Sequence, residues 1–281
     1  MPAGIEGIVL LAGLASGLLH AAWNAAVKAT PDPQAGMLAQ VAGSGAICLC
    51  LMPFVPFPSP ETIPWLLGSG VFNLLTFLAM LRGYASGGGF GLVYPIMRAS
   101  APPLLLAMAW GLRGEAIGPV GMAGIAVVSA GVACFAWGEG GSRRAALGYA
   151  LLSGVMSAGY ALCDAQGARL SGSVLGYGLA ISVLYALVLG SLHVAHRGGG
   201  VVQVVWQHRW IATLAASASV SSYVLILWVW SRAPVALGAA LRDSSVVFAA
   251  LIATWMGERL TAPRIAGTLL VLAGVAVIRF S

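Results

Sequence analysis

The segment SGLLHAAW at residues 16–23 recurs as SGVMSAGY at residues 153–160, an offset of 137 residues (153 − 16). Two further matches follow in the same order: GE at 114–115 with GE at 257–258, and AGV at 130–132 with AGV at 273–275. Between them, the triplet RAS at 98–100 lies opposite RDS at 242–244, with a slip of one residue. Matches in a common order predict two related halves, residues 1–138 and 145–281.

The composition indicates which solvent these halves face. Of the 281 residues, 59% are hydrophobic and only 8% are charged, whereas soluble domains carry about 25% charged residues. This predicts a polytopic protein whose main partner is the lipid bilayer, and we expect it in the cell (inner) membrane. The net charge of +6 is spread as single residues, so nucleic acid is not an expected partner.

The apolar stretches predict an all-α protein with ten membrane-spanning helices. A spanning helix needs about 20 mostly apolar residues. Ten stretches meet this length: 6–28, 35–56, 63–83, 91–112, 117–138, 146–168, 174–195, 210–231, 236–256 and 262–280. Each half then holds five crossings. Because five is odd, the second half begins on the opposite side of the membrane, and the halves form an inverted repeat, a common arrangement in secondary transporters.

Several motifs resemble those of a known family. They are SG…W at 16–23, YPIMRASAPP at 94–103, WGLRGE at 110–115, and ALRDSSVVFAALIATWMGERL at 240–260 followed by a helix with AGV. With these motifs the chain resembles the EamA-type members of the drug/metabolite transporter superfamily over nearly its whole length. The resemblance implies a ten-helix bundle that carries small metabolites such as amino acids, without specifying which one.

Polar and aromatic residues recur on one face of the first helix of each half. Positions three or four residues apart share a helical face. The residues are Ser16, His20, Trp23 and Asn24 in the first half, and Ser153, Ser157, Tyr160 and Asp164 in the second. We predict that these faces line a substrate cavity. The alternative for the serines and Asn24 is hydrogen bonding between helices.

Arg98 and Arg242 each interrupt an apolar stretch. A charged side chain within a membrane is costly and rarely faces lipid. Each arginine could pair with a carboxylate, Asp243 or Asp164, and hold the bundle together. Alternatively, one or both could receive a substrate carboxylate through paired N–H donors. Both alternatives remain open from the sequence.

Aromatic residues at similar depth are candidates for the cavity wall. We predict that Phe77, Tyr94 and Trp228 contribute to it, and Phe90 and Tyr223 could do so as well; the alternative for these aromatic residues is plain packing. Tyr94 directly precedes Pro95, which lacks a backbone donor and can kink a helix. Bent or broken helices at the midplane are where transporters place their binding sites.

Two acidic residues, Glu115 and Glu258, follow the arginine-bearing helices and are expected in interfacial ion pairs, for example with Arg113 and Arg259. Catalytic and nucleotide-binding motifs such as HExxH, GxSxG and the P-loop are absent from the sequence. We therefore expect no enzymatic activity, no metal and no cofactor. Asp164 or His20 is the candidate for taking a substrate amine or a coupling proton.

The charges at the loops do not fix the orientation. Eight Lys and Arg residues lie on one side of the predicted membrane and four on the other, which places both termini outside the cytoplasm. The family resemblance implies termini inside. We expect a monomeric secondary transporter, an exporter, of small zwitterionic or carboxylate-bearing metabolites, which works by alternating access between the two halves. The alternatives are a channel-like facilitator and a membrane enzyme that acts on a lipid-linked substrate.

Overall fold

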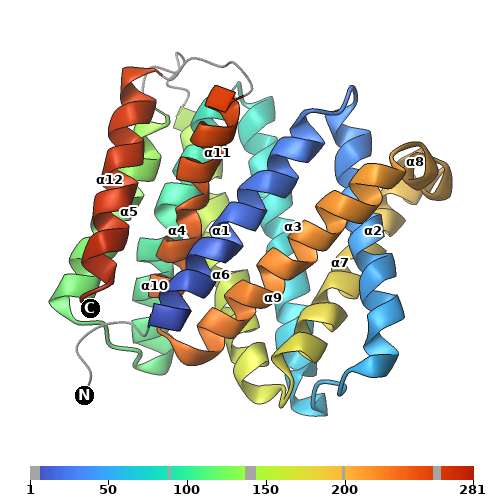
Figure 1. The fold of residues 1–281 in the computed structure, drawn as a ribbon, viewed down its shortest axis with the longest axis horizontal. Coiled ribbons are helices and arrows are strands. Elements are labelled where there is room, and N and C mark those ends of the chain that lie inside the picture. The colour runs from blue at the N-terminus through green and yellow to red at the C-terminus, as the bar shows by residue number, and fades with distance from the viewer. Residues whose placement is uncertain (1–6, 88–89, 137–143, 198–199, 256–260) are drawn as a thin grey trace.

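The computed structural model describes residues 7–87, 90–136, 144–197, 200–255 and 261–281, and in these ranges the chain is helical without strands (Figure 1). Short 3₁₀ or π turns occur at Met52–Phe54, Pro60–Thr62 and Ile211–Ala215. The α-helices are α1 (Gly7–Lys28), α2 (Pro33–Leu51), α3 (Ile63–Ala85), α4 (Phe90–Arg113), α5 (Pro119–Cys134), α6 (Arg144–Leu170), α7 (Val174–Arg197), α8 (Val201–Gln207), α9 (Ala216–Arg232), α10 (Val235–Asp243), α11 (Ser245–Trp255) and α12 (Ala262–Ile278).

Eight helical segments of the described chain are long and apolar enough to cross a membrane. They comprise α1, α2, α3, α4, α6, α7, the π turn with α9, and the first part of the α10–α11 segment. The remaining two apolar helices, α5 and α12, have 16 and 17 residues. At 1.5 Å per residue they extend about 24–26 Å, slightly less than a typical hydrocarbon core of about 30 Å. Each of the ten predicted stretches therefore contains a helix in the described residues, and eight of these segments reach spanning length.

Local sequence signals explain where these helices begin and end. The Oδ1 atom of Asp32 accepts hydrogen bonds from the backbone N–H groups of Gln34 and Ala35, at 3.0 and 3.1 Å, and so caps α2. Pro33 occupies the first turn, where its missing N–H costs nothing. After the C-terminal end of α4, Gly114 adopts φ +64°, a conformation that favours glycine and stops the helix.

The outer surface of the bundle is apolar, as a bilayer requires. Large aliphatic side chains are mostly exposed on helices far apart in sequence, including Leu11 (67%), Leu187 (63%), Leu251 (59%) and Leu269 (61%). Exposed apolar residues on many helices are unusual for a water-soluble protein when they form extended surfaces. The exposure is consistent with a multi-pass membrane protein.

The helices of the two sequence halves pack on each other in an exchanged pattern. The first helix of the chain, α1, packs against α9 and α11, whereas α6 packs against α3 and α4. Helix α2 packs against α7, and α5 packs against α12, side by side in Figure 1. Each half thus places its first helix against the third and fourth apolar segments of the other half.

Two glycines allow the closest of these approaches. A β-carbon on Gly17 of α1 would lie 2.7 Å from the Ser244 Oγ and 3.2 Å from the Arg242 carbonyl oxygen. A β-carbon on Gly154 of α6 would collide with the Ser100 Oγ and lie 3.2 Å from the Met97 carbonyl oxygen. The SG pairs of the repeat therefore pack closely against the two arginine-bearing segments, Gly17 against the segment of Arg242 and Gly154 against the segment of Arg98.

Some sequence predictions fall outside the described residues. These are the GERL segment at 257–260, with Glu258 and Arg259, and most of the joint between the halves at 139–143.

Candidate functional site

The helix that carries Arg242 is interrupted immediately after it. Helix α10 ends at Asp243, and α11 begins at Ser245. The intervening Ser244 donates its backbone N–H to the Leu241 carbonyl at 3.2 Å, a tightened i→i−3 turn. The Ser244 Oγ is buried without a hydrogen-bond partner, so the turn is formed by the backbone alone. The break occurs in the second half of the chain, whereas α4 continues as one helix through Pro95.

A buried ion pair joins the two halves at this break. The Nη2 atom of Arg98 on α4 lies 2.6 Å from the Asp243 Oδ1, and the side chains are 11% and 5% exposed. The same Nη2 donates to the Ser245 Oγ at 3.3 Å. This geometry realises the structural alternative for Arg98, because its charge is balanced by a carboxylate of the other half.

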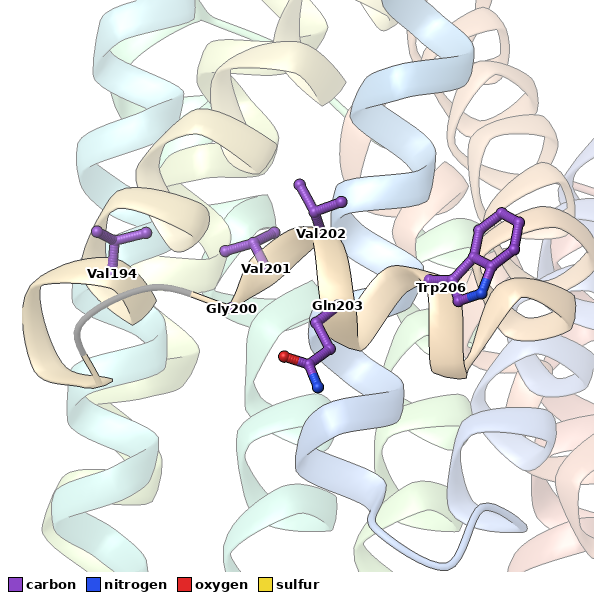
Figure 2. Close-up of a pocket in the computed structure, with 6 residues that line it drawn as sticks. All are labelled: Val194, Gly200, Val201, Val202, Gln203 and Trp206. Atoms are coloured by element: carbon purple, nitrogen blue, oxygen red, sulfur yellow. The ribbon is translucent and has the colours of Figure 1, made fainter.

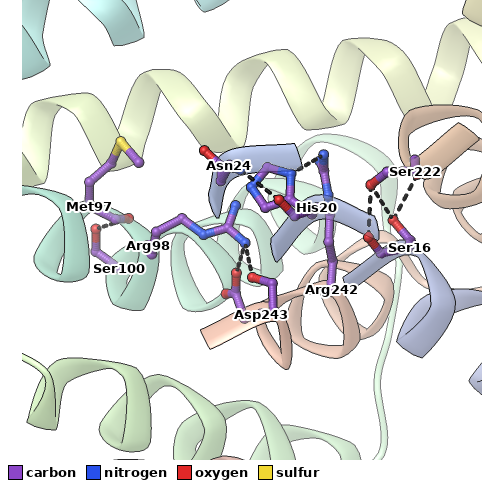
Figure 3. Close-up of polar contacts among 10 residues, drawn as sticks. Ser16, His20, Asn24, Met97, Arg98, Ser100, Ser222, Arg242 and Asp243 are labelled. Atoms are coloured by element: carbon purple, nitrogen blue, oxygen red, sulfur yellow. Dashed lines mark hydrogen bonds and ion pairs between the residues drawn. The ribbon is translucent and has the colours of Figure 1, made fainter. Parts of the chain in front are cut away.

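Arg242 has a different environment. Its Nη2 lies 3.2 Å from the His20 Nδ1 (Figure 3), and its Cζ lies 5.7 Å from the centroid of the Tyr223 ring. Arg242 is only 8% exposed, yet none of the described residues forms an ion pair with it. A guanidinium can only donate hydrogen bonds, so the His20 Nδ1 must act as the acceptor and the ring is neutral in this conformation.

The residues on the predicted polar face of α1 contact two different parts of the bundle. His20 contacts Trp23 edge-on, with ring centroids 5.2 Å apart, and Asn24 donates to the His20 carbonyl at 2.7 Å. Ser16, one turn earlier, is fully buried and exchanges hydrogen bonds with Ser222 of α9, each hydroxyl donating to the other residue's carbonyl at 2.8 Å. His20, Trp23 and Asn24 therefore lie with Arg242, whereas Ser16 joins α1 to α9.

The first helix of the second half repeats this division. Ser153 donates to the Thr76 carbonyl of α3 at 2.9 Å, as Ser16 does to α9. Asp164 is fully buried and accepts hydrogen bonds from the Tyr177 hydroxyl at 3.2 Å and from the Tyr223 hydroxyl. Because the Tyr223 ring also faces Arg242, this one tyrosine links the acid of α6 to the arginine of α10.

The remaining predicted cavity residues are distributed around this cluster. Tyr94 lies one helical turn from Arg98 on α4, Ser157 is buried on α6, and Tyr160 packs against the main hydrophobic core. Trp228 stacks with Arg232, whose Cζ is 4.2 Å from its ring centroid, near the end of α9. Phe77 on α3 is 37% exposed. The described contacts thus do not bring Phe77 or Trp228 to Arg98, Arg242 or Asp243.

Three contributors to the cluster were not predicted from the sequence: Tyr177, Ser222 and Ser245. The serine-rich stretch ASASVSS at 216–222 could have indicated Ser222, since serines in apolar helices commonly bond a neighbouring helix. Tyr177 gave no such signal. It fits because Gly167 of α6 lies against its ring.

Glu115 forms the expected ion pair, but with a different partner. Its Oε1 lies 2.5 Å from Arg169 Nη1, not beside Arg113, and its Oε2 accepts from the Val235 backbone N–H at 3.1 Å. Arg169 also donates to the carbonyls of Trp230 and Ala233 at 3.0 and 3.1 Å. The pair therefore joins α6 to the turn between α9 and α10, where it caps free backbone groups.

A pocket of about 670 Å³ lies elsewhere, at the junction of α7 and α8 (Figure 2). Its lining is Val194, Gly200, Val201, Val202, Gln203 and Trp206, which is nearly all apolar. It contains no ionisable group and none of the predicted site residues. In the described part of the chain, no three His, Cys, Asp or Glu side chains are close enough to share a metal ion.

Comparison with known proteins supports the fold alone. No family model matches the sequence, and no curated protein matches it. A solved structure described only as the crystal structure of a protein is similar, with a TM-score of 0.71. The match covers 96% of this chain and 97% of the other, at 18% sequence identity. The arrangement of helices thus occurs in an experimentally determined protein of nearly the same extent.

Proposed function

We propose that the protein is a secondary transporter, working as an exporter of small metabolites such as amino acids by alternating access. The observation that carries this proposal is the buried charged cluster at the interruption between α10 and α11. Charged residues inside a membrane bundle mark substrate or ion pathways, and broken helices near the midplane mark transporter sites. The sequence resemblance to the EamA-type drug/metabolite transporters supports the same function.

The proposal includes ten crossings arranged as two inverted repeats, residues 1–138 and 145–281. The exchanged packing supports it, because α1 meets α9 and α11 while α6 meets α3 and α4. A two-fold axis that interchanges the halves converts the first set of contacts into the second. In support of an even number of crossings, α1 begins and α12 ends at the same side of the bundle (Figure 1).

The two halves differ in a way that suggests how access alternates. The arginine segment of the second half is broken at Ser244, whereas that of the first half is one continuous helix. Inverted-repeat carriers expose their site to opposite sides by moving one repeat against the other. In our proposal the halves exchange these conformations: α4 opens near Ser100, and α10 and α11 straighten.

The decisive test is transport by purified protein in liposomes. We expect time-dependent uptake of radiolabelled amino acids from a panel, above that of protein-free liposomes. Arg98→Ala and Arg242→Ala separately test the cluster, with Arg144→Ala, an exposed arginine, as the matched control. If no member of the panel is taken up, the proposed function is wrong, and if uptake in both cluster variants equals that of the wild type, the proposed site is wrong.

Liposome experiments also separate the two rival functions. A carrier shows faster entry of labelled substrate when unlabelled substrate is present inside, whereas a channel-like facilitator does not. A membrane enzyme would convert a lipid-linked substrate without net flux. None of the contacts in the described residues favours either rival, so the carrier remains the proposal.

A further inference from the structure

The two buried arginines are not equivalent. Arg98 has its carboxylate, Asp243, at 2.6 Å and a second acceptor, Ser245, at 3.3 Å. Arg242 is at least as well buried, at 8% exposure, but its partners are the neutral His20 nitrogen and the face of the Tyr223 ring. The Nε atoms of both arginines are buried without an acceptor, so the difference between them lies in the partners of their Nη2 atoms. The acid next to Arg242 in sequence, Asp243, forms its ion pair with Arg98 of the other half.

A buried guanidinium without a counter-ion is costly, because desolvation is not repaid by a nearby negative charge. Arginine offers five N–H donors in a fixed planar fork. At Arg242 the described contacts use Nη2 only, and a neutral imidazole supplies no charge. Among the described residues, no anion therefore contacts the Arg242 guanidinium beside the interruption of the helix.

Asp164 is the other buried acid in this part of the described chain, and it forms no hydrogen bond or ion pair with the Arg242 guanidinium. It accepts hydrogen bonds from the Tyr177 and Tyr223 hydroxyls, and the Tyr223 ring also faces Arg242. When ionised, Asp164 balances the overall charge of the cluster without contacting the guanidinium. The cluster then sums to zero: Arg98 with Asp243, and Arg242 with Asp164.

We infer that Arg242 is the receptor for a single ligand carboxylate, and that the ligand is a zwitterionic monocarboxylate. The inference rests on the proposed function and assigns different tasks to the two arginines. Arg98 is locked to Asp243 and holds α4 against the α10–α11 break. A zwitterion enters a cluster of zero net charge without adding charge. A dicarboxylate would require the second guanidinium, which is occupied, and a cation would meet Arg242 unopposed.

Matched ligands test this assignment on the purified wild-type protein. The probes are leucine and phenylalanine, their amides, succinate and putrescine, and the readouts are equilibrium binding and ligand-induced thermal stabilisation. We expect at least one of the two amino acids to bind at least about 10-fold more tightly than its amide, which lacks the carboxylate, because a hydrogen bond to a charged group is lost. Equal binding of acid and amide, or tighter binding of succinate or putrescine, would overturn the inference.

Variants separate a receptor from a packing residue. Arg242→Gln should weaken binding of the amino acid at least about 10-fold and leave binding of the amide unchanged. The double variant Arg98→Gln/Asp243→Asn removes the other pair and should keep the preference for acid over amide. If Arg242→Gln does not fold, Arg242→Lys replaces it, and the wild-type acid–amide comparison still decides. An unaltered preference in the Arg242 variant would contradict the assignment.

Binding and flux give distinguishable failures. Arg242-dependent binding without any transport would leave the receptor in place and remove the proposed function. Transport that does not depend on Arg242 would support the proposed function and remove Arg242 as the receptor.

Discussion

The ion pair between Arg98 and Asp243 makes a quantitative prediction. In Asp243→Asn, the 2.6 Å contact loses its negative charge, and two guanidiniums, Arg98 and Arg242, remain buried without a carboxylate between them. Breaking a buried pair by removing one partner costs about 3–5 kcal/mol. Because the two side chains are only 11% and 5% exposed, screening by solvent should reduce this little. We therefore expect the free energy of unfolding to fall by about 3–5 kcal/mol.

The assay is equilibrium unfolding of the purified protein in mixed micelles, followed by fluorescence of its nine tryptophans. The double variant Arg98→Met/Asp243→Leu removes both charges and should recover most of the loss, since apolar replacement of a whole buried pair is often neutral. Glu61→Gln, an exposed acid, is the control and should change stability by less than about 0.5 kcal/mol. The reasoning would be refuted if this double variant lost as much free energy of unfolding as the single variants Arg98→Met and Asp243→Leu lose when their losses are added.

Three further predictions use the same unfolding assay. Gly17→Val should lower the free energy of unfolding by about 1–3 kcal/mol, because its β-carbon would lie 2.7 Å from the Ser244 Oγ. In the control Gly111→Val the β-carbon meets no atom within 4 Å, so the change should be near neutral. Equal effects of the two substitutions would argue against the close packing. Tyr223→Phe should cost about 1–3 kcal/mol by leaving Asp164 one donor short, and a change under about 0.5 kcal/mol would show that this hydrogen bond contributes little. Glu115→Gln should cost about 1–2 kcal/mol, less than the central pair, because Arg169 and Glu115 are 25% and 18% exposed; a loss equal to that of Asp243→Asn would contradict this ranking.

The sequence predicted most of the helices, because a bilayer requires long apolar segments and leaves few alternatives. It also identified the SG pairs of the repeat, which the structure places against the two arginine segments. Helix length was less predictable. The stretches 117–138 and 262–280 are mostly apolar, but α5 and α12 have only 16 and 17 residues in the described chain.

The site was predicted in kind but not in detail. Composition alone indicated that Arg98 and Arg242 need partners, yet it could not show which arginine receives the nearby acid. That choice depends on how α4 crosses the α10–α11 segment. Similarly, the sequence indicated that the helix around Pro95 could bend, whereas the interruption occurs at Ser244, between α10 and α11. Proline is tolerated in membrane helices when neighbouring groups satisfy the freed carbonyl, so residue type was a weaker guide than tertiary packing.

Counterflow in liposomes tests the central claim most directly. Wild-type protein is reconstituted with unlabelled amino acid inside, and entry of the labelled amino acid is compared with that into empty liposomes. The account predicts accelerated entry for wild type and for Arg144→Gln, and its loss in Arg242→Gln. Entry that does not depend on the internal substrate, or acceleration that persists in Arg242→Gln, would contradict it.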